Sequence, residues 1–197
     1  MIEIERGDRL GEAHRRGITE VLVRGFAEDF EYFSSDPEKL ADAFEHMVIP
    51  ERFYAALVDG EPAAVASLTT GDEECFAPRA SEFRRHLGAV HGTISHLVVR
   101  SQFLGAPDEA REGLAEIGFV TTAPAHQGRG VATALMRHLI ALPGYDEFIL
   151  REIKDDNAPA LGLYAKLGFT EYERRPVKFA RKAGFKEYVS LKLTRTA

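Results

Sequence analysis

The chain has little cysteine and no long apolar run. Cys75 is its single cysteine, which excludes an internal disulfide framework. No stretch approaches the roughly 18 consecutive apolar residues that a membrane span needs, and the opening residues MIEIERGDRLGEAHRR lack the apolar centre of a secretory signal peptide. These absences predict a cytoplasmic protein with no membrane partner.

Two standard nucleotide-binding motifs are also missing. The sequence contains no G-x-x-x-x-G-K-[ST], and its glycine loop is not a G-x-G-x-x-G that follows a first strand. These absences argue against the P-loop type of ATP site and against a dinucleotide-binding fold.

Composition and charge indicate an ordinary globular chain. Its 197 residues are 45% hydrophobic and 28% charged, enough to bury a sizeable core, and no Ser-, Pro- or Gly-rich linker divides them. We therefore expect one domain over residues 1–197. The net charge of −6 argues against a nucleic-acid partner and favours cationic ones, although it also serves solubility alone.

Periodicity predicts strands and helices in a mixed order. A short strand at IEIE precedes helical spacing from Leu10 to Phe33, and a second helix begins at Pro37 after a capping Asp36. The dipeptide Asp59-Gly60 predicts a hairpin. Helical spacing then covers residues 79–103, with Gly88 and Gly92 as possible breaks. The remaining pattern is strand, helix, strand, helix and two strands, which gives an α/β fold.

A glycine loop stands between the predicted strand GLAEIGFVTT and the predicted helix ATALMRHLIAL. In His126-Gln127-Gly128-Arg129-Gly130-Val131-Ala132, the first helical N–H groups have no intrahelical partner, and the helix dipole adds positive charge there. Such an end binds phosphate well, because glycine lets an anion approach the amides. Taken alone, the loop is equally a tight turn that starts a helix.

Two motifs resemble those of the GNAT superfamily of acetyl-CoA-dependent N-acetyltransferases. The segment QGRGVA is similar to the family signature Q/R-x-x-G-x-G/A, and DDNAPALGLYAKLGFTEYE resembles the family's second cofactor motif. The resemblance covers roughly residues 115–173. It implies one GNAT-type α/β (α+β) domain, with a mixed, mostly antiparallel sheet flanked by helices. Residues 79–103 depart from the family as a helical insertion between the third and fourth strands.

The resemblance implies acetyl-CoA as cosubstrate and a set of residues that hold it. Backbone amides of the loop would bind the pyrophosphate, and the strand edge before it would pair with the pantetheine. Asn157 would contact the cofactor or cap a helix. The implied cofactor-binding residues are Val120, Thr121, Thr122, Gln127, Gly128, Arg129, Gly130, Val131, Ala132, Thr133 and Asn157.

Two side chains occupy positions that several family members use for catalysis. Glu116 would act as the general base, often through water, because an amine must be neutral to attack a thioester. Its alternative is a rim carboxylate that pairs with Arg or Lys. Tyr164 would donate a hydrogen bond or proton to the departing thiolate. Its alternative is a core aromatic beside Leu161 and Leu167.

In the family, the acceptor lies beside the first helices, where this chain reads GFAEDFEYFSSDPEK. Carboxylates among aromatic rings could attract a cationic amine and pack against its apolar part. The alternative is a solvated acidic face over an aromatic core stripe. The candidate substrate residues are Glu28, Asp29, Phe30, Tyr32 and Phe33.

Neither cysteine nor histidine predicts further chemistry. Nothing near Cys75 indicates a lowered pKa, so a covalent acyl route is not expected. His86, His91 and His96 recur every five residues, which turns each toward a different helix face and predicts no metal site.

These observations predict an acetyltransferase that transfers the acetyl group directly to a primary amine of a small molecule. Within the same chemistry, a protein lysine or an N-terminal amine is the alternative acceptor. A chain that binds acyl-CoA as a non-catalytic sensor is the alternative from another class. The insertion at 79–103 would cover the acceptor pocket or contribute to a homodimer contact.

Overall fold

The computed structural model describes residues 1–105, 111–178 and 180–195. Its strands form one sheet: β1 (Ile2–Arg6), β2 (Phe53–Val58), β3 (Glu61–Thr70), β4 (Leu114–Thr122), β5 (Glu147–Lys154), β6 (Thr170–Pro176) and β7 (Glu187–Thr194). The order across this seven-stranded sheet is β1-β2-β3-β4-β5-β7-β6. Strands β4 and β5 are parallel and the other described neighbours antiparallel, which confirms the expected mixed sheet.

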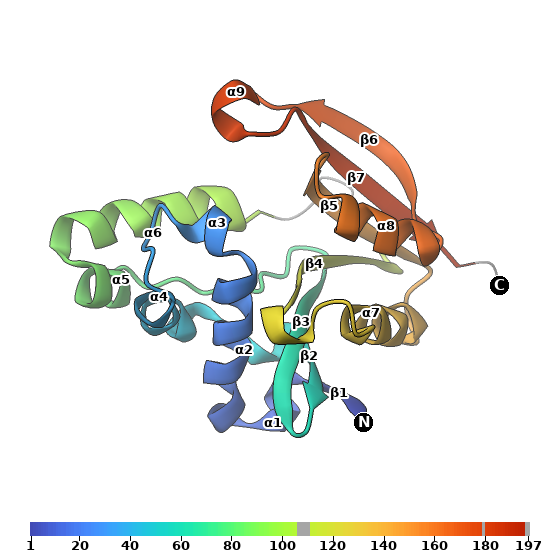
Figure 1. Ribbon diagram of the computed structural model, residues 1–197, viewed down its shortest axis with the longest axis horizontal. Coiled ribbons are helices and arrows are strands. Elements are labelled where there is room, and N and C mark those ends of the chain that lie inside the picture. The colour runs from blue at the N-terminus through green and yellow to red at the C-terminus, as the bar shows by residue number, and fades with distance from the viewer. Residues whose placement is uncertain (106–110, 179, 196–197) are drawn as a thin grey trace.

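Helices cover both faces of the sheet (Figure 1). They are α1 (Gly7–Leu10), α2 (Glu12–Gly25), α3 (Ala27–Phe30), α4 (Pro37–Phe44), α5 (Ala80–Leu87), α6 (Ala89–Phe103), α7 (Val131–Ala141), α8 (Ala158–Lys166) and α9 (Ala180–Ala183), with short 3-10 turns at Glu45–Met47, Pro50–Arg52 and Pro124–His126. Among the described helices, none is long and apolar enough to span a bilayer.

Alternation along the strands divides the buried side chains into two clusters. In β2, Phe53 and Ala55 belong to the cluster that includes α2, α4, α5 and α6, whereas Ala56 belongs to the cluster that includes α7 and α8. We call these two sides the α2 face and the α7 face of the sheet. The functional residues described below divide between them.

Local turn chemistry forms as the sequence predicts. The Asp36 side chain caps α4 by accepting from the amides of Glu38 and Lys39. Asp59 and Gly60 have φ values of 55° and 85° between β2 and β3, as a tight hairpin requires.

The predicted helical spacing over Leu10–Phe33 is divided among α1, α2 and α3. Gly11, at φ 78°, separates α1 from α2. Helix α2 ends at Gly25, where an added Cβ would lie 1.7 Å from Thr121 Oγ1 of β4. The close approach of α2 to β4 therefore requires glycine at this helix end.

The insertion between β3 and β4 is present as the antiparallel pair α5 and α6. It breaks at Gly88, whose φ is 86°. Gly92 does not break α6, because it lies where the helices cross and an added Cβ would be 2.3 Å from the Phe83 carbonyl oxygen. The outer side of α6 leaves Val90, Ile94 and Leu97 exposed at 75%, 44% and 59%.

Candidate active site

The parallel strands β4 and β5 separate midway along the sheet. They pair at Leu114, Ala115 and Glu116, opposite Glu147, Phe148 and Ile149. Beyond this point β4 continues to Thr122 and β5 to Lys154 without pairing to each other. The splayed β4 edge therefore offers free backbone groups to an extended ligand, such as the pantetheine arm that the sequence resemblance implies.

Each separating strand carries a β-bulge. In β4 the register shifts opposite Val65 and Ser67, and Phe119 adopts φ 48°. In β5 it shifts between Leu150 and Ile153, and Glu152 adopts φ 56°. A positive φ is unfavourable for both residue types, and bulges of this kind often lie beside active sites.

The glycine loop connects the end of β4 to α7. Gly128 and Gly130 have φ values of 71° and 78°, and an added Cβ on either would meet nothing within 4 Å. The amides of the described residues 128–133 have no hydrogen-bond partner, and Ala134 is the first to bond, to the Gly130 carbonyl at 2.9 Å. This accessible set of N–H groups at a helix N-terminus fits the pyrophosphate of coenzyme A.

Side chains around the loop hold it against β4. Gln127 Nε2 donates to the Thr122 carbonyl at 3.3 Å. The Thr121 side chain faces Gly25 at the end of α2, and Val120 packs against the cluster on the α7 face. The expected cofactor residues of β4 and the loop are therefore brought together.

The carboxylate of Glu116 lies at the last paired position before the strands separate. Arg151 Nε donates to Glu116 Oε1 at 3.0 Å, and Arg151 Nη2 donates to Oε2 at 2.8 Å. Burial lowers the pKa of Arg151, but the hydrogen bonds and charge of Glu116 outweigh it and raise that pKa above its ordinary value. Glu116 is thus part of a bidentate ion pair.

Sequence reasoning did not single out Arg151. Because side chains alternate along a strand, Arg151 shares a face with Ile149, which lies opposite Glu116. The available signal was one arginine inside the apolar strand EFILREI. It became informative only once the β4–β5 register was known.

Tyr164 and Asn157 lie on α8. Tyr164 is 5% exposed within the cluster on the α7 face, and burial raises the pKa of its hydroxyl. That hydroxyl therefore stays protonated and able to donate. Asn157 caps α8, since its Oδ1 accepts from the Ala160 amide at 3.2 Å.

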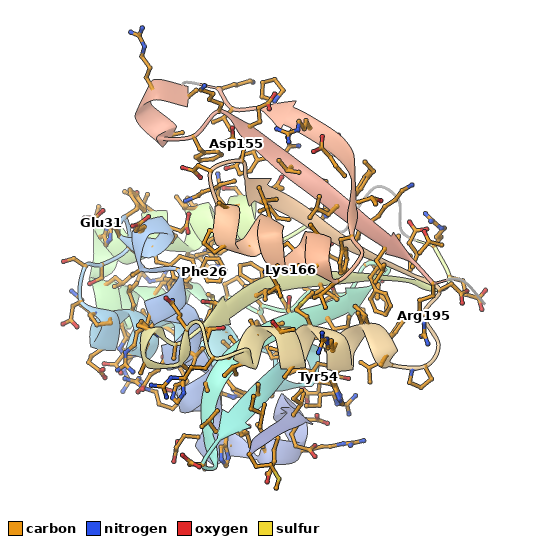
Figure 2. All side chains as sticks on the ribbon, turned by 45° about the vertical axis from the view of Figure 1, so that its right-hand side comes forward. Phe26, Glu31, Tyr54, Asp155, Lys166 and Arg195 are labelled. Carbon is orange, nitrogen blue, oxygen red and sulfur yellow. The ribbon has the colours of Figure 1, made fainter. Side chains whose placement is uncertain are left out.

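The candidate acceptor residues divide into core and surface. Phe30 and Phe33 are 1% and 4% exposed and pack around Phe44 and Phe103, so their rings belong to the core, the alternative stated above. Glu28, Asp29, Glu31 and Tyr32 are exposed, with Glu31 at the edge of the molecule in Figure 2. Of these candidates, only the surface groups are accessible to a ligand, and Asp29 is already paired with Lys154.

Cysteine and histidine take part in packing. Cys75 is buried, and burial raises the pKa of its thiol to about 12, which makes it a poor nucleophile. His91 contacts the Phe33 carbonyl, and His96 packs on Phe83. The described residues contain no cluster of three His, Cys, Asp or Glu side chains that could hold a metal.

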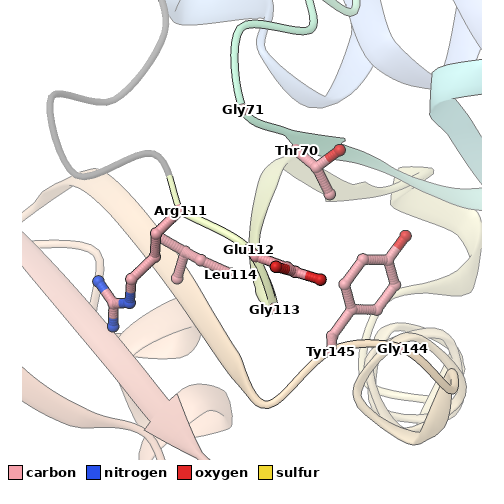
Figure 3. A pocket seen from close by; sticks show the side chains of 8 residues that line it. All are labelled: Thr70, Gly71, Arg111, Glu112, Gly113, Leu114, Gly144 and Tyr145. Carbon is pink, nitrogen blue, oxygen red and sulfur yellow. The ribbon is translucent and has the colours of Figure 1, made fainter.

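An open cavity of about 420 Å³ lies elsewhere, at the start of β4 (Figure 3). The glycine loop follows the other end of this strand, so the cavity is not part of the candidate site. Its lining residues are Thr70, Gly71, Arg111, Glu112, Gly113, Leu114, Gly144 and Tyr145.

Several known proteins are similar to this chain. A mycothiol acetyltransferase of Tsukamurella paurometabola is 43% identical over 65 residues, which are 32% of this chain and only 22% of that protein. An N-acetyltransferase structure from Staphylococcus aureus aligns over 97% of this chain and all of its own, at 15% identity and a TM-score of 0.62. The ribosomal-protein-S18-alanine N-acetyltransferase of Escherichia coli aligns over 100% and 96%, at 18% identity and a TM-score of 0.57.

A third structure, YncA from Salmonella typhimurium with its cofactor acetyl-CoA, aligns over 98% of this chain and 93% of its own, at 20% identity and a TM-score of 0.55. These structural likenesses show a shared fold. The model of the acetyltransferase (GNAT) family matches residues 18–169, most of the chain. The chain therefore belongs to the GNAT family of acetyltransferases, enzymes that use acetyl-CoA.

Proposed function

We propose that this chain transfers the acetyl group of acetyl-CoA to a primary amine of a small cationic molecule. The observation that carries the proposal is the separation of β4 from β5 beside the free amides of residues 128–133. Acetyl-CoA supplies an activated thioester when bound. Gly128, Gly130 and the neighbouring amides would hold its pyrophosphate, and the free edge at Val120–Thr122 would align its amide-bearing arm.

Glu116 and Tyr164 suit the two proton transfers of the reaction, one from the attacking amine and one to the departing thiolate. Alternation places Glu116 on the α2 face, opposite Ala115 and Ile117 of the α7-face cluster, and Tyr164 lies on the α7 face. We infer that the acceptor approaches from the α2 face and the cofactor from the α7 face. Their reacting groups would meet in the gap between β4 and β5.

In the proposed reaction, Glu116 takes the proton of the attacking amine, directly or through one water. The amine nitrogen forms a bond to the acetyl carbonyl carbon, and the carbon–sulfur bond breaks. Tyr164 donates its hydroxyl proton, or a hydrogen bond, to the sulfur that leaves. Each Glu116 oxygen keeps one lone pair outside the Arg151 ion pair, so the carboxylate retains the capacity to accept a proton.

The acidic surface of α3 and the residue after it supports a cationic acceptor. Glu28, Glu31 and Tyr32 are exposed, and Asp29 already holds a cation, Lys154. A protein lysine or N-terminal amine remains the alternative acceptor, and a non-catalytic acyl-CoA sensor remains the alternative function.

The oligomeric partner and the cellular location stay predictions. For the expected homodimer, the candidate surface is the outer side of α6, where Val90, Ile94 and Leu97 are exposed at helical spacing. The cytoplasmic location rests on the sequence alone.

The test is a screen of purified protein with acetyl-CoA against separate classes of amine: diamines and polyamines, amino acids, lysine peptides and peptides with free N-termini. Free thiol is measured for each class. Release only with small cationic amines supports the proposal. Release only with peptides favours the protein acceptor, and coenzyme A binding without release under any amine favours the sensor.

A further inference from the structure

The Glu116–Arg151 ion pair is joined to the end of the insertion. Arg151 Nη2 also faces the Gly105 carbonyl oxygen at 3.5 Å, and the Gly105 amide donates to Glu74 Oε1 at 2.9 Å. A connected series therefore runs from Glu74 through Gly105 and Arg151 to Glu116. It links the loop after β3, the segment after α6, the bulge of β5 and the last paired residue of β4.

The geometry at Glu116 requires a guanidinium. Two parallel N–H groups of Arg151 meet the two carboxylate oxygens, which fixes the plane of the carboxylate as well as its position. A lysine ammonium at residue 151 would supply the charge without the planar fork. The side chains of Arg151 and Glu116 are 30% and 18% exposed, so water screens this pair less than a fully exposed pair.

We propose that Arg151 is a positioning residue for acetyl transfer. It holds the Glu116 carboxylate in the orientation that the amine requires, and the Gly105 carbonyl at the end of the insertion limits where the guanidinium can lie. This inference rests on the proposed role of Glu116 as the base. A carboxylate that turns out of this plane no longer directs a lone pair at the amine, so loss of the guanidinium should slow proton transfer without weakening coenzyme A binding.

The competing explanation is that Arg151 only ties β4 to β5. A tie would affect stability and the amount of active enzyme, but not kcat per folded molecule. The chain offers a matched control in Arg174, which also makes a bidentate pair, through Nε and Nη2 to Glu171 at 2.7 and 2.9 Å, on the edge strand β6.

The first experiment measures kcat per folded molecule and KM for wild type, Arg151→Met, Arg151→Lys and Arg174→Met. Without the guanidinium, kcat at neutral pH should fall on the order of 100-fold, at the low end for a positioned general base. The KM for acetyl-CoA should stay within about twofold. Because lysine supplies the charge without the planar fork, Arg151→Lys should recover only part of kcat, and Arg174→Met should keep the wild-type value. A wild-type kcat per folded molecule in Arg151→Met would overturn the proposal.

The second experiment needs no turnover. Hydrogen exchange in the free protein should become faster at Gly105 and the end of α6 in Arg151→Met and in Glu74→Met, which removes the acceptor of the Gly105 amide, and remain unchanged in Arg174→Met. Unchanged exchange in both test variants would overturn the link to the insertion. Failure of the proposed function would give a different result from failure of this inference. In that case Glu116→Gln would keep full turnover, whatever the result for the Arg151 variants.

Discussion

Lys154 Nζ lies 2.6 Å from Asp29 Oδ1, so the end of β5 is tied to α3 across the α2 face. Partial burial lowers the pKa of Lys154, but the hydrogen bond and charge of Asp29 raise it above its ordinary value. The two side chains are 33% and 39% exposed, so the pair stabilises the fold little. Because the pair lies beside the proposed acceptor entrance, it should affect the binding of the acceptor.

A cationic acceptor would compete with Lys154 for Asp29. We expect Lys154→Gln to lower the KM for a cationic amine about two- to fivefold, since an exposed pair is worth about 0.2–1 kcal/mol. Steady-state kinetics at low ionic strength measure this change. Lys39→Gln, on α4, removes an equal charge from an exposed position. Equal KM values for the two variants would show that Asp29 does not take part in acceptor binding.

Gly130→Glu should abolish measurable coenzyme A binding, with Kd raised at least about 100-fold. The new side chain would occupy the space over the free amides and place a negative charge where the pyrophosphate lies. Isothermal titration calorimetry measures the affinity.

Gly144→Glu is the matched control for that loop variant. Gly144 has φ 89° and open space around an added Cβ, so both substitutions carry a similar backbone penalty of about 1 kcal/mol. Thermal unfolding should therefore change alike in the two proteins, whereas only Gly130→Glu should lose coenzyme A. Normal binding by Gly130→Glu would refute the phosphate cradle.

Tyr164→Phe should lower kcat on the order of 100-fold while leaving the Kd for coenzyme A nearly unchanged, because only the proton donor is lost. The ring stays, so its packing on Phe169 and the stability of the fold should persist. Rapid-quench measurement of the acetyl-transfer step tests this. A wild-type rate would contradict the role of Tyr164 as proton donor and would leave the alternative, a core aromatic residue.

His46 should make the fold less stable in mild acid. Burial lowers its pKa to about 4, with nearby Arg79 adding to the effect, and its Nε2 accepts from the Arg79 amide at 2.9 Å. The unfolded chain binds a proton near pH 6.5 and the folded chain does not. The stability from neutral His46 is therefore complete above about pH 6.5 and declines as the pH falls toward 4.

Urea unfolding at pH 7.5 and pH 5 measures this loss, which we expect to be on the order of 1 kcal/mol after allowance for partial solvent screening. His46→Gln cannot take up that proton, so its stability should change less between the two pH values. An equal loss in both proteins would assign the acid sensitivity to other groups.

Local signals in the sequence predicted much of the fold and the glycine loop that begins α7. Asp59-Gly60 forms its hairpin and Asp36 its cap because these depend on neighbouring residues alone. The glycine loop was predictable for the same reason. The ion pair of Glu116 with Arg151 was not, because it depends on the register between two strands that are distant in sequence.

The acceptor part of the site also could not be predicted from local sequence signals alone. Phe30 and Phe33 had a spacing that fits either a binding surface or a core stripe. Their burial depends on Phe103 at the end of the insertion, about 70 residues further along the chain. Only the tertiary arrangement decides between the two.

The most direct test of the account follows the acetyl group itself. Wild-type protein and Glu116→Gln are each incubated with [¹³C]acetyl-CoA and an amine from the screen, and acetylated amine and free thiol are measured together by mass spectrometry and thiol titration. We predict equal amounts of both products with wild type, a rate lower by about 100-fold or more with Glu116→Gln, and the same coenzyme A affinity in both. Tight coenzyme A binding by wild type with no acetylated amine, or full activity in Glu116→Gln, would contradict it.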